Sequence, residues 1–144
     1  MASREQALTA LLAVVASTAA FKLTSRRDRA PESIGPAESP ALFLVETGEE
    51  YRRPAINLPP IRTLRVDAIF YNDVGSSLNA VPLTLINAAL DALDVALQPD
   101  NRMTGLFTLG GLVNSVTIDG EIQKATGAKT GKAAAIVPLR ILLP

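Results

Sequence analysis

Two segments of the chain place apolar residues at the spacing of an amphipathic helix. The first is residues 4 to about 18, where the apolar side chains that share one face are Leu8, Leu11, Leu12 and Val15. Ser3 and Gln6 form a capping box before this stripe, so the helix is predicted to begin at Arg4. The second segment is residues 82–98, whose apolar face holds Leu83, Ile86, Leu90, Leu93 and Leu97 and which Pro99 ends. We therefore expect two helices that each bury one face.

Five further segments have the composition or the alternation of β-strands. Residues 61–71 alternate most clearly, with Leu64, Val66, Ala68 and Phe70 on one side and Arg65 and Asp67 on the other. The remaining predicted strands are residues 21–24, 41–46, 113–124 and 132–143. In the last two of these, the predicted buried residues are Val116, Ile118, Ile122, Val137, Leu139, Ile141 and Leu143. Because Pro138 has no N–H to donate, we expect the last strand to lie at a sheet edge or to carry a bulge there.

Two long segments between these elements lack periodicity and are predicted to be loops. Residues 25–40 are rich in Arg, Pro, Gly and Ser. Residues 47–60 contain prolines at positions 54, 59 and 60, and a turn is predicted at Gly48, Glu49 and Glu50. We expect this second segment to form the long, protruding tip of a hairpin between the strands at 41–46 and 61–71.

The order helix, three strands, helix, two strands predicts an α+β fold with both helices packed on one face of the sheet. We expect a mainly antiparallel or mixed sheet of about five strands. A chain of 144 residues suits one domain, which would bury roughly 70% of the surface that the unfolded chain exposes. We therefore assign residues 1–144 to a single domain with long loops at about 25–40 and 47–60.

The composition removes most catalytic and metal-binding chemistry. The chain contains no His and no Cys, so it lacks the side chains that hold structural zinc, the usual general base of a serine triad and the cysteine nucleophile. Fourteen basic and fourteen acidic residues cancel, unlike the strongly positive charge of a dedicated nucleic-acid binder. Catalysis by Asp or Glu side chains is not excluded by composition, because the chain has fourteen acidic residues. We expect no enzyme activity, no catalytic residue, no cofactor and no metal.

The apolar residues 7–20 resemble the central part of a secretory signal. The residues before them carry Arg4 and Glu5 together and so lack the net positive charge that a signal needs. About fourteen apolar residues are also too few to cross a bilayer, which takes about twenty. We expect a soluble, cytoplasmic protein with no membrane partner.

Two patterns suggest ligand chemistry but fail on detail. Residues 127–132, Gly-Ala-Lys-Thr-Gly-Lys, look like a phosphate-binding loop, yet three residues instead of four separate the glycines and Ala133 stands where magnesium needs a hydroxyl. We expect a loop between two strands instead. Asp91 and Asp94 lie three apart on the second predicted helix, where they could share a metal. The neighbouring Leu93 faces the core, so both aspartates are placed in solvent.

Charged residues in the two predicted loops form a candidate assembly interface. These residues are Arg26, Arg27, Arg29, Glu49, Glu50, Tyr51, Arg52 and Arg53. One interpretation is solubilising loop surface. A second is contact with another subunit, because Arg and Tyr are enriched where interfaces exclude water. Contact with DNA phosphates is the weakest of the three, since glutamates accompany the second cluster.

Several short stretches together carry a resemblance to a known family. They are Pro40-Ala41-Leu42-Phe43-Leu44, Leu58-Pro59-Pro60, Leu64-Arg65-Val66-Asp67, Ile86-Asn87-Ala88-Ala89-Leu90-Asp91-Ala92-Leu93, Thr108-Leu109-Gly110-Gly111-Leu112-Val113, Asp119-Gly120-Glu121-Ile122 and Ala135-Ile136-Val137-Pro138-Leu139. In these stretches, spread over nearly the whole chain, the sequence resembles the tail terminator family of long-tailed bacteriophages. None of them is a chemical motif, so the resemblance concerns the fold and its role.

The resemblance implies a structural virion protein at the head-proximal end of a viral tail. Its subunits would form a ring, commonly a hexamer, that sits on the last ring of tail tube protein, stops polymerisation and meets the head connector or head-completion protein. Genomic DNA would pass through the lumen without sequence-specific binding. A head-to-tail connector or tail-completion protein is the alternative within the same class. A small ligand-binding domain, from another class, would need a pocket lined by convergent polar groups.

Overall fold

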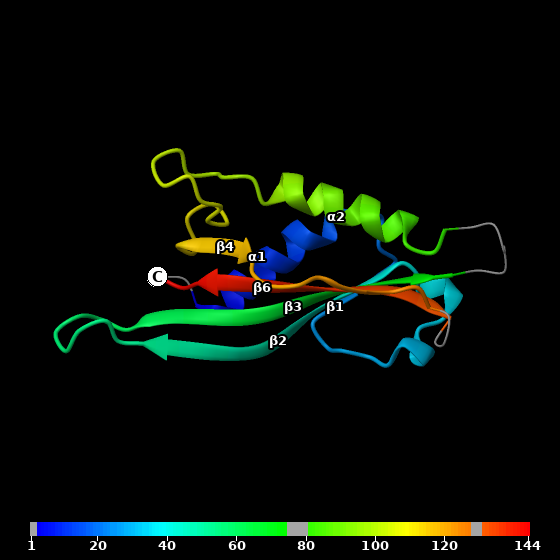
Figure 1. The fold of residues 1–144 in the computed structure, drawn as a ribbon, viewed down its shortest axis with the longest axis horizontal. Coiled ribbons are helices and arrows are strands. Elements are labelled where there is room, and N and C mark those ends of the chain that lie inside the picture. Colours follow the sequence, from blue (N-terminus) through cyan, green and yellow to red (C-terminus); the bar gives the residue numbers. More distant parts are fainter. Residues whose placement is uncertain (1–2, 75–80, 128–130) are drawn as a thin grey trace.

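The computed structural model describes residues 3–74, 81–127 and 131–144. A six-stranded mixed sheet carries two helices on one face (Figure 1). The helices are α1 (Arg4–Ala16) and α2 (Thr84–Ala96), and the strands are β1 (Leu23–Ser25), β2 (Ala41–Arg52), β3 (Ile61–Asp73), β4 (Ser115–Ile118), β5 (Gln123–Ala125) and β6 (Lys132–Leu142). The short 3-10 turns η1 (Pro31–Ser33) and η2 (Pro36–Glu38) interrupt the loop between β1 and β2. The predicted α+β fold is confirmed.

α1 begins where its capping box predicts. The Gln6 N–H donates to the Ser3 hydroxyl over 3.2 Å, and the Ser3 N–H donates to the Gln6 side chain over 2.8 Å. These two bonds satisfy backbone N–H groups that have no partner inside the helix. The predicted stripe faces the sheet, because Leu8, Leu11 and Val15 are fully buried. The helix ends at Ala16, two residues before the predicted end.

The hairpin of β2 and β3 differs from the prediction in length. The pairing of the two strands continues to Arg52 opposite Ile61, with a bulge between Glu46 and Gly48. The turn predicted at Gly48, Glu49 and Glu50 is therefore wrong, and the hairpin loop is residues 53–60. The bulge takes up one extra residue in β2, so the strand continues past a glycine that reads as a turn signal in sequence.

β6 lies inside the sheet, between β3 on one side and β4 and β5 on the other. Its register with β3 is continuous from Lys132 to Leu142, so the predicted edge position or bulge at Pro138 is wrong. The predicted strand over 113–124 forms two strands instead of one, and Pro138 lies opposite the gap between them. The Pro138 carbonyl accepts the Asp119 N–H over 3.0 Å on that side. A strand residue directs its N–H and C=O to the same side, so the missing N–H faces the interruption in the outer strand.

The main core fills the space between the helices and the sheet. The predicted buried faces of β3 and β6 are confirmed, and their side chains pack with both helices: Leu64, Val66, Ala68, Phe70, Val137, Leu139, Ile141 and Leu143. A smaller cluster on the opposite sheet face consists of Ile34, Ala41, Phe43, Ile69 and Tyr71. Ile34 comes from the loop of residues 26–40, which covers only the end of the sheet where β2 begins. The rest of that face, toward the hairpin, is mixed, with Thr63, Arg65 and Arg140 beside Ile61 and Leu142.

Within the part of the chain that the structure describes, every helix falls short of the length and apolar character that a membrane crossing requires.

Candidate assembly surfaces

Arg26, from the first predicted cluster, holds three elements together within one subunit. Its guanidinium donates to the Glu5 carboxylate of α1 at 2.6 Å and to the Glu46 carboxylate of β2 at 3.3 Å. The hydrogen bond from Arg26 lowers the pKa of the Glu5 carboxyl below its usual range. The charge of Arg26 is therefore already paired within its own subunit.

Arg29 is also engaged locally, whereas Arg27 is not. The Arg29 guanidinium pairs with the Glu38 carboxylate at 2.8 Å and fastens the two ends of the 26–40 loop to each other. The side chain of Arg27 is exposed and makes no ion pair with a described residue. Of the three arginines in this cluster, only Arg27 therefore presents an uncommitted charge.

The second predicted cluster divides in the same way. Arg4 of α1 pairs with the Glu49 carboxylate and donates to the Tyr51 hydroxyl at 2.7 Å, and its hydrogen bond lowers the pKa of Glu49. Glu50, on the other side of β2, pairs with Arg65 of β3 at 3.2 Å. The strand alternation explains this division, since Glu49 and Tyr51 face the helices while Glu50 faces away.

Arg52 and Arg53 remain exposed where the hairpin leaves the sheet. Neither side chain forms an ion pair with any residue that the structure describes. The two predicted clusters are not brought together: the tip of the hairpin projects at one end of the molecule, and the 26–40 loop lies under the other half of the sheet (Figure 1). Arg26 is the exception, because it pairs with Glu5, the neighbour in sequence of the Arg4 that pairs with Glu49.

The projecting hairpin, residues 51–61, is here called the hairpin arm. Its loop exposes apolar side chains that pattern analysis of the sequence missed: Ile56 is 89% exposed and Leu58 is half exposed. Monomeric proteins bury such groups when they can, so grouped exposed apolar residues mark interaction sites. The signal in sequence is weak, because single apolar residues between prolines have no periodicity. The arm therefore combines apolar and basic groups without partners.

The outer face of α2 has the opposite charge. Asp91 and Asp94 are exposed, as predicted, and neither forms an ion pair with a described residue. Val95 beside them is 70% exposed, and Leu85 is partly exposed further along the helix. No basic residue occupies the last turn of α2. Because the C-terminal end of a helix carries partial negative charge, these aspartates make a negative patch with an apolar centre.

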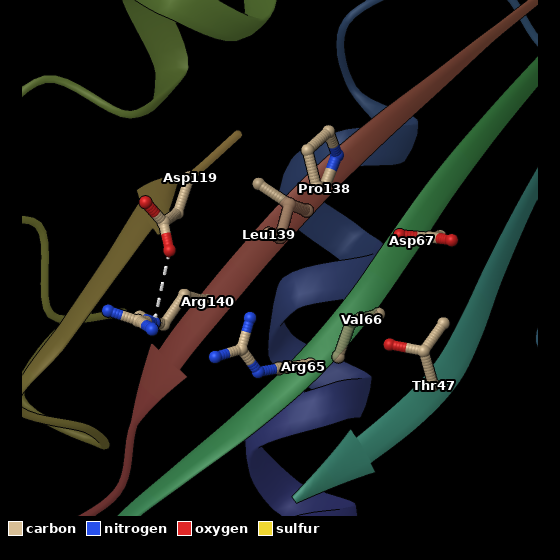
Figure 2. A pocket seen from close by; sticks show the side chains of 8 residues that line it. All are labelled: Thr47, Arg65, Val66, Asp67, Asp119, Pro138, Leu139 and Arg140. Atoms are coloured by element: carbon tan, nitrogen blue, oxygen red, sulfur yellow. Dashed lines mark ion pairs between the residues drawn. The ribbon is translucent and has the colours of Figure 1, made fainter. Parts of the chain in front are cut away.

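Charged side chains also line a hollow on the uncovered sheet face (Figure 2). Arg65 and Arg140 are direct cross-strand neighbours there, and Arg140 lies 3.3 Å from the Asp119 carboxylate. The Arg140 Nε is within ion-pair distance of that carboxylate but is not aligned for a hydrogen bond. Burial raises the pKa of Asp67 at the edge of the hollow. The hollow has a volume of about 130 Å³, below the range of about 300 to 1,000 Å³ that small-molecule sites occupy.

The segment that resembles a phosphate loop leads directly into β6, so a strand follows it and not a helix. Residues 128–130 of that segment lie outside the described residues. Lys132, its last residue, is buried and lies 3.7 Å from the Asp73 carboxylate. Among the residues described, there is no group of three or more acidic side chains placed to hold a metal ion.

Solved structures with a similar fold include one from a virus-like particle. The fold is similar to that of a chain in the structure described as the virion of the native gene transfer agent particle, with a TM-score of 0.52 and 12% sequence identity. The similarity covers 91% of this chain and 84% of that chain. No protein-family model and no curated protein sequence matches this chain. At this identity the similarity shows a shared fold over nearly the whole molecule.

Proposed function

We propose that this protein is a structural, non-catalytic subunit of a virion, and that copies of it form a closed ring that caps the tail tube. The observation that carries the proposal is the fold similarity to a chain of a virion, because it extends over 91% of this chain. The resemblance of the sequence to phage tail terminators gives the more specific role. Six copies are proposed for the ring on that resemblance.

The surface of the subunit supports a role in assembly. The hairpin arm and the outer face of α2 both expose apolar and charged side chains that have no partner among the described residues. A ring requires two different surfaces on each subunit, because each copy meets its neighbours on opposite sides. The lack of His and Cys in the sequence is consistent with a role that needs no catalysis.

The proposed partners are other copies of the chain, the tail tube protein and the head connector. The test is polymerisation of purified tail tube protein with and without this chain, with tube lengths measured by electron microscopy. Capping predicts short tubes whose length falls as the concentration of this chain rises. Unchanged tube lengths together with binding to head connectors would instead identify a head-to-tail connector. Unchanged lengths without binding to tubes or connectors would contradict the proposal.

A further inference from the structure

We propose that the hairpin arm of one subunit docks on the C-terminal half of α2 of the next copy, pairing Arg52 and Arg53 with Asp91 and Asp94. The inference rests on the proposed function, since it assigns the contact that would build the ring. The occupant of the α2 patch is therefore a second copy of this chain.

Charge is the first argument for this pairing. Arg52 and Arg53 are adjacent in sequence, exposed and without ion pairs to described residues. Asp91 and Asp94, three residues apart on α2, are likewise exposed and without such pairs. By contrast, Arg4, Arg26, Arg29, Arg65 and Arg140 all pair with carboxylates of their own subunit. Opposite charges that are left unused on two separate surfaces are what a charge-matched contact requires.

The helix itself strengthens the preference for a basic partner. Asp91 and Asp94 lie near the end of α2 where the backbone carbonyls already give a negative potential, and no basic side chain of the last turn offsets it. A neighbour that supplies two guanidinium groups at this point would neutralise both the carboxylates and the helix end. The patch is therefore unfavourable in isolation and favourable when an arm covers it.

Apolar contact is the second argument. Ile56 at the tip of the arm and Val95 on the patch are 89% and 70% exposed. Ile56 lies in the same arm as Arg52 and Arg53, and Val95 on the same half of α2 as Asp91 and Asp94, so the proposed contact would also cover these two apolar side chains. An apolar centre surrounded by charged groups is the arrangement found in protein interfaces.

The geometry makes the contact one between copies. Figure 1 shows the arm projecting beyond the end of the sheet, well separated from α2 of the same subunit, whose C-terminal end points toward the same end of the molecule. The two surfaces differ, so the contact is heterologous, and it closes into a ring if the rotation between neighbours allows it.

A charge-reversal experiment tests the pairing. Arg52→Glu with Arg53→Glu should weaken self-association by at least about tenfold, and so should Asp91→Lys with Asp94→Lys. A chain that carries all four changes should associate again, to within about threefold of the unchanged chain, because opposite charges again face each other. Arg27→Glu is the control, since this arginine is exposed and unpaired but lies outside the arm. Association is measured by mass photometry and sedimentation, both alone and with tail tubes.

Crosslinking gives a second readout, because the chain has no cysteine of its own. An Ile56→Cys chain mixed with a Val95→Cys chain should form disulfide-linked heterodimers in preference to either homodimer. Met103→Cys replaces Val95→Cys in the control, since Met103 is even more exposed, at 97%, but lies in the loop after α2 and not on the helix.

The outcomes separate the two proposals. Rings that form normally in the reversed variants and crosslink no better through Val95 than through Met103 would overturn this inference and leave the proposed function standing. Failure of the unchanged chain to assemble, in solution and on tubes, would overturn both.

Discussion

Leu93 and Leu85 show how two leucines of one helix differ in what they contribute. Leu93 is fully buried against the sheet, while Leu85 is 38% exposed on the outer face of α2. We predict that Leu93→Ala lowers the free energy of unfolding by about 2 to 5 kcal/mol, because it leaves a cavity in the main core. Leu85→Ala should cost on the order of 1 kcal/mol or less. Urea denaturation followed by circular dichroism measures both, and equal losses would mean that the buried face of α2 is misassigned.

Asp100 gives the fold a dependence on pH. Its carboxylate accepts the N–H groups of Gly110 at 2.9 Å and Thr108 at 2.7 Å, and these bonds, with Gly110 the largest cause, lower its pKa. A carboxyl whose pKa is lower in the folded state stabilises the fold above its unfolded pKa of about 3.9, and that contribution is lost as the pH falls through the folded pKa.

Asp100→Asn should therefore destabilise the protein at pH 7 and make a smaller difference at about pH 2, because the contribution of the charged carboxylate is lost as the pH falls through the folded pKa of Asp100. Urea unfolding of the two proteins at both pH values measures this. A loss of the same size at the two pH values would show that the charge of Asp100 is not what closes the 100–111 loop.

The roles of single charged residues were the least predictable part of the sequence. The sequence identifies Glu49 and Arg26 as candidate interface groups, but Arg4 lies 45 residues from Glu49 and Glu5 lies 21 residues from Arg26. Only the fold brings these pairs together, and the same two residues then serve to fasten α1 to the sheet. Arg52 and Arg53 form no ion pair with a described residue, so an interface role for them stays a prediction.

At the scale of elements, the sequence predicts best where signals are local. The capping box of α1 and the apolar faces of β3, β6 and α2 are set by neighbours within a few residues, and the structure contains them as predicted. The predicted length of β2 was too short, because the strand continues through a bulge after Glu46 that depends on pairing with β3. The sheet-edge position predicted for Pro138 was wrong as well. The gap between β4 and β5 that accommodates this proline is created by residues that are distant in sequence.

Gly105 and Gly127 allow the cost of backbone strain to be distinguished from the cost of steric overlap when a side chain is added in a turn. Gly105 and Gly127 both have positive φ, at +68° and +83°, which L-residues rarely adopt. A Cβ at Gly105 meets open space, whereas one at Gly127 would lie 2.6 Å from the Lys132 backbone and 2.6 Å from the Val74 side chain.

Gly105→Ala should therefore cost about 1 to 2 kcal/mol from backbone strain alone. Gly127→Ala should cost a further 1 to 3 kcal/mol, because the turn that precedes β6 must shift to relieve the overlap. The comparison is made by thermal unfolding of the two variants beside the unchanged chain. Equal costs would mean that the turn has room that the described packing does not show.

At the scale of the whole molecule, the core and the surface have different roles: the core stabilises the fold, and parts of the surface are proposed to mediate assembly. The apolar residues of the sheet and both helices form one core on the helix side, and the charged loops are largely tied to their own subunit. The hairpin arm and the outer face of α2 both expose apolar and charged groups that form no ion pair with described residues. The subunit therefore carries two unlike surfaces, as the proposed ring requires.

The most direct test of this account is electron microscopy of tail tubes incubated with the purified protein. The account predicts a closed ring of about six subunits on one end of each tube, and no further growth of the capped tubes when more tube protein is added. Bare tube ends that continue to grow, with the protein remaining a monomer in the surrounding solution, would contradict it.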